Sequence, residues 1–312
     1  MDKNDARLIF MGTPEISASV FEEMILDGFN FVGLISQPDK PIGRKGQIEP
    51  SPTKKVALKY DIPIFQPQKI RVDYEFVNDL KPDLIITFAY GQIIPQGLLN
   101  IPTLGCLNLH GSLLPKLRGA SPVQYALING EKTTGVTLMR MVKEMDAGEM
   151  YGKKEVIIEQ NDNATSLFTK ISKAAGELAR ELLPIFLKGE LKGIEQDVNA
   201  VTFAPLIKAE QEKLSFELSI DELLGWIKGL SDKPGGYFLL DDKKIKIYRA
   251  SIHDRTIVGQ VGEIVQLDKK AFLLQAKDGT LSIEEVQLEG KKAMDYRSFA
   301  NGLSHLKGKI LK

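Results

Sequence analysis

The sequence predicts a two-domain α/β protein in which a Rossmann-like, open and mostly parallel sheet domain is followed by a small all-β, OB-like barrel domain. Three observations support this fold class. Short apolar runs alternate with amphipathic stretches over residues 1–188, a polar stretch follows, and short strand patterns separated by turn residues fill the remainder. A length of 312 residues agrees with two domains, because single cores seldom grow beyond about 250–300 residues.

The first domain is expected over residues 1–188 and begins with a strand, a turn and a helix. The apolar run at 8–11 stops at Gly12, and an amphipathic stretch follows at 17–26. Further strands are expected at 29–35, 83–89, 105–110 and 135–141, and further helices at 54–59, 122–128 and 165–187. This alternation predicts parallel βαβ units with helices on both faces of the sheet.

A polar, Gly-containing linker is expected over residues 189–208, and a second domain over 209–312. The second domain begins with one helical pattern, at 220–230. Five short strands are then expected at 236–240, 244–250, 259–265, 271–275 and 280–287. Strands of this length at such close spacing are typical of a small barrel, most of all an OB-fold.

Composition excludes several classes of site. Lys plus Arg and Asp plus Glu both number 41, so no global charge attracts nucleic acid or membrane. One cysteine, Cys106, and three histidines form neither a disulfide framework nor a Cys/His zinc site of ordinary spacing. No apolar stretch approaches the ~18 residues that span a bilayer, and the amino-terminal residues do not resemble a signal peptide. A cytoplasmic location without a membrane partner is expected.

Two polar side chains end the strand at 105–110. Ligands collect outside the carboxyl ends of parallel strands, and alternation places Asn108 and His110 on one face, ~6.6 Å apart along the backbone. Taken alone, this pair is better explained as two satisfied polar residues beneath a loop, and Asp146 as a turn residue. Together the three supply an oxyanion donor, a proton acceptor and an anion that orients the imidazole and stabilises its charge.

Competing chemistries have weaker support. Cys106 and His110 lie ~13 Å apart along one strand, too far for a nucleophilic pair. Ser112 lacks the Gly-x-Ser-x-Gly elbow of serine hydrolases. Gly12 is the only glycine of the first turn, so neither dinucleotide-binding nor P-loop patterns occur there. An acyl-transfer site therefore remains the best-supported interpretation of the polar residues at the end of this strand.

A long stretch around this strand is recognisable. Residues 107–124 read Leu-Asn-Leu-His-Gly-Ser-Leu-Leu-Pro-Lys-Leu-Arg-Gly-Ala-Ser-Pro-Val-Gln. They are followed by Gly-Val-Thr at 135–137 and Met-Asp-Ala-Gly at 145–148. This combination resembles the folate-dependent formyltransferases, a family of enzymes that move a one-carbon unit from a reduced folate to an amino group.

The resemblance implies roles for individual residues. Asn108, His110 and Asp146 would be the catalytic set, 10-formyltetrahydrofolate the co-substrate, and no metal is expected. The folate-binding residues would be Ser112, Leu113, Leu114 and Pro115, together with Tyr90 and Gln92 at the end of the preceding strand. A loop bounded by Gly and Pro and carrying two leucines offers the apolar wall and the backbone hydrogen bonds that a flat pterin needs.

Further matches indicate which branch of the family the chain resembles. Residues 10–15, the insertion at 37–44 and the stretches at 286–292 and 299–302 are similar to members that formylate initiator methionyl-tRNA for translation initiation. The implied partners are this tRNA and the folate, with no membrane and a monomeric chain, although the sequence carries no direct signal of oligomeric state.

The insertion also suggests how tRNA is held. Residues 37–55 hold five basic against two acidic residues, and Arg44 and Lys45 are predicted to contact the tRNA. Solvated surface lysines would give the same pattern. Two alternatives stay open: a formyltransferase acting on a nucleotide amino sugar or another small amine, and a non-catalytic RNA-binding module built around the second domain.

Overall fold

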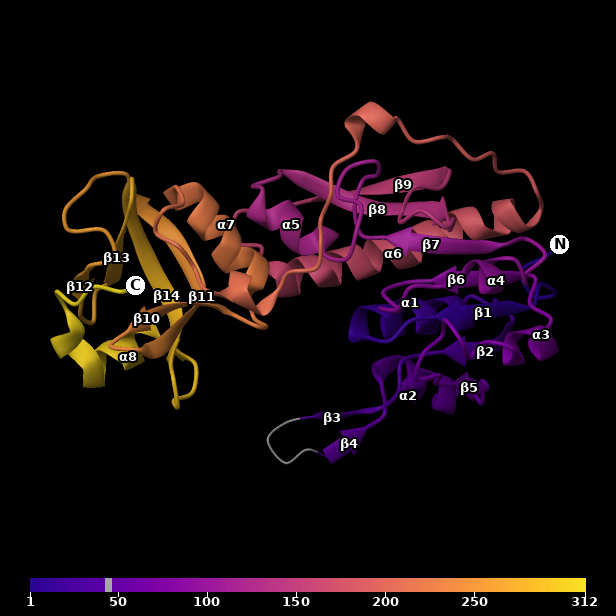
Figure 1. Ribbon diagram of the computed structural model, residues 1–312, viewed down its shortest axis with the longest axis horizontal. Helices are drawn as coiled ribbons and strands as arrows, with labels where there is room; N and C mark the ends of the chain where they lie inside the picture. The colour runs from indigo at the N-terminus through magenta and orange to yellow at the C-terminus, as the bar shows by residue number, and fades with distance from the viewer. Residues whose placement is uncertain (43–46) are drawn as a thin grey trace. The chain divides into compact units, whose positions relative to one another are not determined.

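A computed structural model of the chain describes residues 1–42 and 47–312, which form two compact units (Figure 1). The first unit consists of residues 1–122, 133–157 and 168–205. The second consists of residues 123–132, 158–167 and 206–312. The second unit therefore includes two short segments from the middle of the chain as well as the carboxyl-terminal third.

A seven-stranded sheet forms the centre of the first unit, in the order β5-β2-β1-β6-β7-β8-β9. The strands are β1 (Leu8–Met11), β2 (Phe31–Ile35), β5 (Ile64–Phe65), β6 (Leu84–Thr87), β7 (Cys106–His110), β8 (Thr133–Arg140) and β9 (Met150–Ile157). The five from β5 to β7 run parallel, whereas β8 and β9 are antiparallel. The predicted open, mostly parallel sheet is confirmed.

Helices cover both faces of this sheet. They are α1 (Glu15–Leu26), α2 (Pro52–Lys59), α3 (Phe76–Leu80), α4 (Gln96–Leu99) and α6 (Ala164–Leu187). On one face Phe21 of α1 stacks on Phe10 of β1, with ring centroids 4.7 Å apart. On the other face Leu98 of α4 packs with Ile85 and Cys106. The alternation of side chains along each strand thus buries both of its faces, as expected of a parallel sheet.

A hairpin, β3 (Lys40–Ile42) and β4 (Gln47–Glu49), interrupts the passage from β2 to α2. Helix α2 begins after Ser51, whose side chain accepts a hydrogen bond from the backbone of Lys54, with Pro52 in the first turn. Ser51 and Pro52 therefore fix the start of the helix at residue 52. The expected start at residue 54 is two residues too late.

The second unit contains an antiparallel sheet in the order β10-β11-β14-β13-β12, and β15 pairs with β14. Its elements are α7 (Ile220–Leu230), β10 (Gly236–Leu240), β11 (Lys243–Asp254), β12 (Ile264–Leu267), β13 (Phe272–Ala276), β14 (Gly279–Leu288), β15 (Met294–Asp295) and α8 (Tyr296–Leu303). Its core combines strand residues such as Phe238 and Phe272 with Leu223 of α7 and Phe299 of α8. The predicted smaller β-rich domain is confirmed.

Helix α5 (Pro122–Ile128), apart from its first residue, belongs to the second unit. It lies against α7 at two glycines: a Cβ on Gly225 would be 2.6 Å from the carbonyl oxygen of Ile128, and one on Gly229 2.7 Å from the Ile128 side chain. The two helices therefore approach so closely that neither position has room for a side chain.

One strand prediction is wrong in position. Residues 259–265 were expected to form a strand, but β12 spans Ile264–Leu267 and the preceding residues are a loop. Gly262 has φ +86°, a conformation that breaks strand pairing, and its NH donates to the carbonyl of Gln275. Among the described residues no helix is long and apolar enough to cross a membrane.

Candidate active site

Strand β7 carries the first two predicted catalytic residues. It pairs in parallel with β6 and antiparallel with β8, so that Asn108 lies between Thr87 and Met139 in register. His110, two residues on, presents its side chain to the same face and is 5% exposed. The Asn108 side chain is partly exposed and makes no hydrogen bond within residues 1–42 and 47–312, so its amide is free to bind a ligand.

Asp146 reaches this strand from the loop that joins β8 to β9. Its Oδ2 atom lies 3.7 Å from Nδ1 of His110 and accepts a 2.8 Å hydrogen bond from the backbone NH of Gly119. Asp146 has φ +50°, in the left-handed region that a residue with a side chain seldom adopts. The structure thus brings His110 and Asp146 together, 36 positions apart in the sequence.

The hydrogen bonds of His110 define which ring nitrogen is free. Nε2 lies 2.9 Å from the carbonyl oxygen of Leu117, which only accepts, so Nε2 carries a proton and donates it there. In the neutral ring the lone pair is then on Nδ1, beside the Asp146 carboxylate. A proton taken up at Nδ1 would give a positive ring next to that carboxylate, which is a suitable arrangement for a general base.

The predicted folate loop is held by Thr137 of β8. The Thr137 hydroxyl donates to the carbonyl of Ser112 at 2.7 Å and accepts from the NH of Leu114 at 3.1 Å. Ser112 donates its own hydroxyl to the carbonyl of Lys116 at 2.6 Å, and Leu114, which precedes Pro115 through a cis peptide, is fully buried. Leu113 packs against Gly135, where a Cβ would lie 2.6 Å from the leucine methyl. These contacts hold the loop against β8.

Tyr90 and Gln92 follow β6, where Ala89 and Gly91 both have positive φ and turn the chain. The Tyr90 side chain is buried in the core, its hydroxyl has no partner among the described residues, and burial raises its pKa to about 12. Its carbonyl already accepts hydrogen bonds from Thr13 and Gln37, so among the described residues the backbone NH is the polar group of Tyr90 left for a ligand. Gln92 accepts a hydrogen bond from the NH of Ile70 at 3.0 Å.

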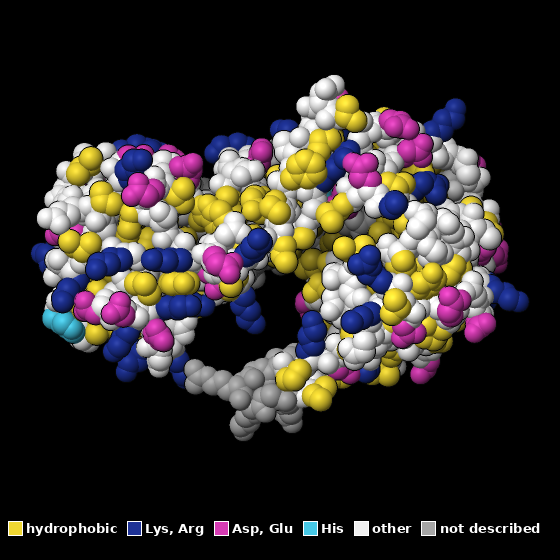
Figure 2. Space-filling view, in the orientation of Figure 1, with side chains coloured by type: hydrophobic (Ala, Val, Ile, Leu, Met, Phe, Trp, Pro, Cys, Tyr) yellow, Lys and Arg dark blue, Asp and Glu magenta, His cyan; other side chains and the backbone are white. Residues whose placement is uncertain are grey.

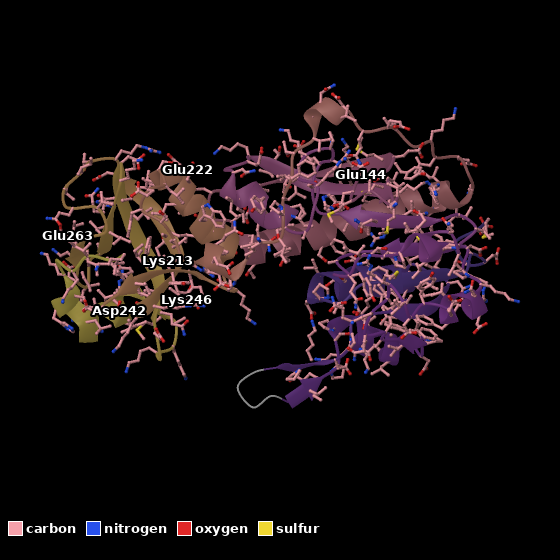
Figure 3. All side chains as sticks on the ribbon, viewed as in Figure 1. Glu144, Lys213, Glu222, Asp242, Lys246 and Glu263 are labelled. Atoms are coloured by element: carbon pink, nitrogen blue, oxygen red, sulfur yellow. The ribbon has the colours of Figure 1, made fainter. Side chains whose placement is uncertain are left out.

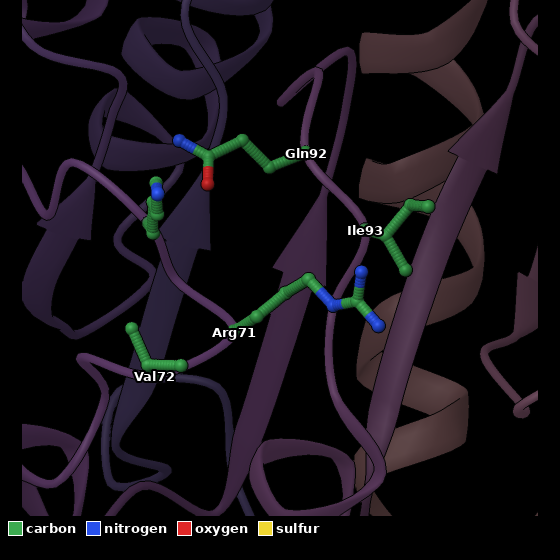
Figure 4. Close-up of a pocket in the computed structure, with 5 residues that line it drawn as sticks. Arg71, Val72, Gln92 and Ile93 are labelled. Atoms are coloured by element: carbon green, nitrogen blue, oxygen red, sulfur yellow. The ribbon is translucent and has the colours of Figure 1, made fainter.

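Gln92 also lines an open pocket of about 590 Å³, shown in Figure 4. The other lining residues are Lys69, Arg71, Val72 and Ile93. Lys69 and Arg71 have no ion-pair partner within the described part of the chain, whereas Val72 and Ile93 expose apolar side chains. This combination suits a ligand with an apolar body and a negatively charged end.

Polar side chains anchor the base of the β3–β4 hairpin. Lys54 pairs with Asp39 at 2.5 Å, and Gln66 donates to Asp39 at 2.8 Å. Although burial raises the pKa of Asp39, the hydrogen bonds from Lys54 and Gln66 outweigh it and hold that pKa below its ordinary value. The predicted tRNA-contacting residues Arg44 and Lys45 lie outside the described residues.

Two buried polar residues near Asp146 were not predicted as site residues. They are Arg118 and Gln196, which hydrogen-bond to each other at 3.0 Å. Arg118 lies within the recognisable stretch 107–124, and a basic residue there could have been noticed. Gln196 lies in the segment predicted as a linker, and no sequence signal distinguishes it from neighbouring polar residues.

Comparison with known proteins gives the family. Residues 6–183 match the family described as Formyl transferase, and residues 206–304 match Formyl transferase, C-terminal domain. The methionyl-tRNA formyltransferase of Bacillus pumilus is 42% identical over 301 residues, covering 95% of each chain. That of Bacillus subtilis is 40% identical over 308 residues, covering 98% of this chain and 97% of the relative.

Solved structures share the fold at lower identity. HypX from Aquifex aeolicus in complex with tetrahydrofolic acid superposes with a TM-score of 0.66 at 19% identity, covering 96% of this chain and 47% of its own. The sugar 3N-formyl transferase WlaRD, studied with dTDP and 5-N-formyl-THF, superposes with a TM-score of 0.67 at 18% identity, covering 92% and 99%. With both family matches and relatives of this identity over nearly its whole length, the chain belongs to the formyl transferase family.

Proposed function

We propose that the chain transfers the formyl group of 10-formyltetrahydrofolate to the α-amino group of initiator methionyl-tRNA, for translation initiation. The observation that carries this proposal is the series of curated relatives named methionyl-tRNA formyltransferase, which are 39–42% identical and cover 95–98% of the chain. The enzyme would act in the cytoplasm as a monomer, with the folate as a co-substrate and without a metal.

Asn108, His110 and Asp146 can perform this reaction. The methionyl amine attacks the formyl carbon, and the Asn108 amide donates a hydrogen bond to the oxyanion of the tetrahedral intermediate. Nδ1 of His110 accepts the amine proton, and Asp146, 3.7 Å away, stabilises the resulting positive ring. When the bond from the formyl carbon to the folate nitrogen breaks, the same proton can pass to that nitrogen. One C–N bond forms, one breaks, and no oxidant is needed.

The loop at Ser112 to Pro115 and the pocket beside Gln92 supply features that a folate requires. The partly exposed Leu113 offers apolar surface, the fully buried Leu114 anchors the loop, and the backbone held by Thr137 offers hydrogen-bonding groups. Lys69 and Arg71 in the pocket suit the carboxylates at the glutamyl end of the folate. Two relatives in fold, HypX and WlaRD, were studied with tetrahydrofolic acid and 5-N-formyl-THF, which supports a folate here.

A nucleotide amino sugar is the main alternative acceptor, since WlaRD is a sugar formyltransferase. Its 18% identity supports a common fold, whereas the relatives that match at about 40% identity have names that specify methionyl-tRNA. A non-catalytic RNA-binding protein would have no use for a fixed folate loop or a free amide beside a His–Asp pair.

The test is a direct comparison of acceptors. The purified chain is incubated with 10-formyltetrahydrofolate carrying a labelled formyl group and either charged initiator methionyl-tRNA, uncharged tRNA or a nucleotide-linked amino sugar. We expect label on the methionyl α-amine and none on the other two. Transfer to the sugar but not to methionyl-tRNA would favour the alternative acceptor, and folate binding without transfer to any amine would contradict the proposal.

A further inference from the structure

The side chain of Gln196 joins the segment after α6 to the loop that carries Asp146. It is 8% exposed, and its Nε2 atom donates two hydrogen bonds, to the backbone oxygens of Asp146 and Gly148, both at 2.8 Å. Its Oε1 atom accepts from Nε of Arg118 at 3.0 Å. Both amide hydrogens and the amide oxygen are therefore satisfied by groups on two other segments of the same unit.

Arg118 sets the orientation of this amide. Its guanidinium is buried and only donates, so it faces the amide oxygen, and the amide nitrogen must point toward the two carbonyl oxygens. Arg118 is held in place by its backbone, which bonds to Thr202 at 2.9 Å and to Ala204 at 2.7 Å. Its Nη1 atom also lies 3.7 Å from Glu144, labelled in Figure 3, and Glu144 belongs to the β8–β9 loop that carries Asp146.

The loop around Asp146 needs such a support. Asp146 has φ +50°, in the left-handed region, and such a conformation persists only where neighbouring contacts hold it. The preceding residue, Met145, is 59% exposed and adds little packing. The carboxylate needs a defined position, since Oδ2 bonds to Gly119 and faces His110. The two bonds from Gln196 hold the carbonyl of the strained residue itself and that of Gly148, two residues later.

We propose that Gln196 is a positioning residue, which fixes the backbone at Asp146 and Gly148 so that the Asp146 carboxylate stays beside His110, with Arg118 orienting the Gln196 amide. This role rests on the proposed function. Gln196 does not touch the reacting atoms and acts through Asp146. A misplacement of about 1 Å in a catalytic group can reduce turnover ~10²-fold.

The kinetic test uses Gln196→Met, which keeps the length of the side chain but removes its hydrogen bonds. We expect kcat for methionyl-tRNA formylation to fall roughly 10- to 100-fold, with KM for tRNA and folate changed less than about twofold. Combined with Asp146→Asn, it should reduce kcat little further, because both changes act through one carboxylate. A multiplicative effect in the double variant, or a normal kcat in Gln196→Met, would overturn the proposal.

Gln275 provides a matched control in the second unit. It is fully buried and also donates two hydrogen bonds from its amide, to the carbonyls of Ala276 and Gly279, both at 2.9 Å. Gln275→Met should lower the melting temperature while kcat stays within about twofold of wild type. An equal loss of kcat in this variant would assign the effect of Gln196→Met to general destabilisation.

A second readout needs no substrate. The backbone NH of Gly119 bonds to the Asp146 carboxylate, so its hydrogen exchange should accelerate in Gln196→Met but stay unchanged in Gln275→Met. Gln196→Glu keeps an acceptor for Arg118 but loses the two donors. It should therefore behave like Gln196→Met, and it is used instead if Gln196→Met does not fold. Unchanged Gly119 exchange in both variants would overturn the role. An inactive wild type would contradict only the proposed function, because the exchange test is independent of it.

Discussion

His110 depends on oxygen atoms on both sides of its ring. The carbonyl of Leu117 takes the Nε2 proton, and the Asp146 carboxylate lies beside Nδ1. Both partners come from residues with left-handed backbones, φ +59° at Leu117 and +50° at Asp146. Strained residues of this kind gather where the surroundings determine one geometry, as at catalytic sites. The proposal that Nδ1 is the general base rests on this difference between the two sides of the ring, a carbonyl at Nε2 and a carboxylate at Nδ1.

Cys106 shares a strand with Asn108 and His110, yet we predict that it is chemically inert. Its side chain is almost fully buried, and burial raises the pKa of the thiol to about 12, against a smaller lowering effect of Arg140. The thiolate is the reactive form, so iodoacetamide at pH 8 should alkylate the native chain far more slowly than the urea-unfolded chain, and formylation activity should persist.

The raised pKa of the Cys106 thiol also predicts how the stability of the fold changes with pH. The folded thiol stays protonated up to a pKa of about 12, whereas the unfolded thiol ionises near its ordinary value of 9.0. Its contribution to the free energy of unfolding is therefore fully present below pH 9 and decreases as the pH rises toward 12. Because Cys106 is the single cysteine, alkylation at comparable rates in native and unfolded chain would contradict this account directly.

Residue spacing predicted part of the site and missed the rest for a physical reason. Alternation along β7 correctly places Asn108 and His110 on one face, since that is a local property of a strand. The approach of Asp146 depends on bonds to Gly119 and Gln196 from distant segments, which only the fold reveals. The catalytic role of all three residues, like the folate role of the loop at Ser112, stays a prediction.

At the level of elements, the β3–β4 hairpin is fixed at its base. Asp39 binds both Lys54 and Gln66, and Gln37 donates from its side chain to the carbonyl of Tyr90 at 2.9 Å. The hairpin therefore leaves the sheet next to the residues predicted to meet the folate. Arg44 and Lys45 of this insertion lie outside the described residues, and their contact with the acceptor end of a tRNA stays a prediction.

We predict that Arg44→Ala raises the apparent KM for methionyl-tRNA while folate affinity is unchanged, since phosphate contacts position a substrate without altering chemistry. Loss of one contact worth about 1 kcal/mol would raise KM roughly fivefold at low salt. The effect should shrink with rising salt, and the salt slope of binding should fall by about one.

Lys59→Ala is the matched control for the charge change. Lys59 also belongs to the first unit, but it pairs with Glu22 at 2.6 Å and is not part of the hairpin. Its removal should leave KM for tRNA unchanged. Equal kinetics of Arg44→Ala and wild type at low salt would exclude a tRNA contact for this residue.

Two helices of the structure were predicted almost to the residue. The expected helix at 165–187 corresponds to α6, and the helix expected at 220–230 corresponds to α7 without change of bounds. Strand β9 was missed because it is a sheet edge whose residues alternate between partly buried and exposed, with Lys153, Lys154 and Glu155 among them. Helix α8 was missed because its eight residues make only about two turns, although its apolar residues lie on one side and Asp295 caps it.

Over the whole molecule, the formal net charge of zero means that no overall field attracts tRNA. Figure 2 shows basic and acidic side chains interspersed over the visible surface, in agreement with equal numbers of the two charge types. Attraction to tRNA must therefore come from local groups such as the insertion, and not from a general field. The two-unit organisation was predicted from the change in composition, but the inclusion of α5 in the second unit depends on its close approach to Gly225 and Gly229.

The central claim is that the free amide of Asn108 stabilises the oxyanion during formyl transfer. The measurement that tests it most directly is the single-turnover rate of Asn108→Ala with the folate and methionyl-tRNA both saturating. We expect the single-turnover rate of Asn108→Ala to fall ~10²–10³-fold while both substrates still bind. The control Asn78→Ala changes an exposed asparagine in α3, and its rate should equal that of wild type. A rate for Asn108→Ala close to that of wild type would contradict the account.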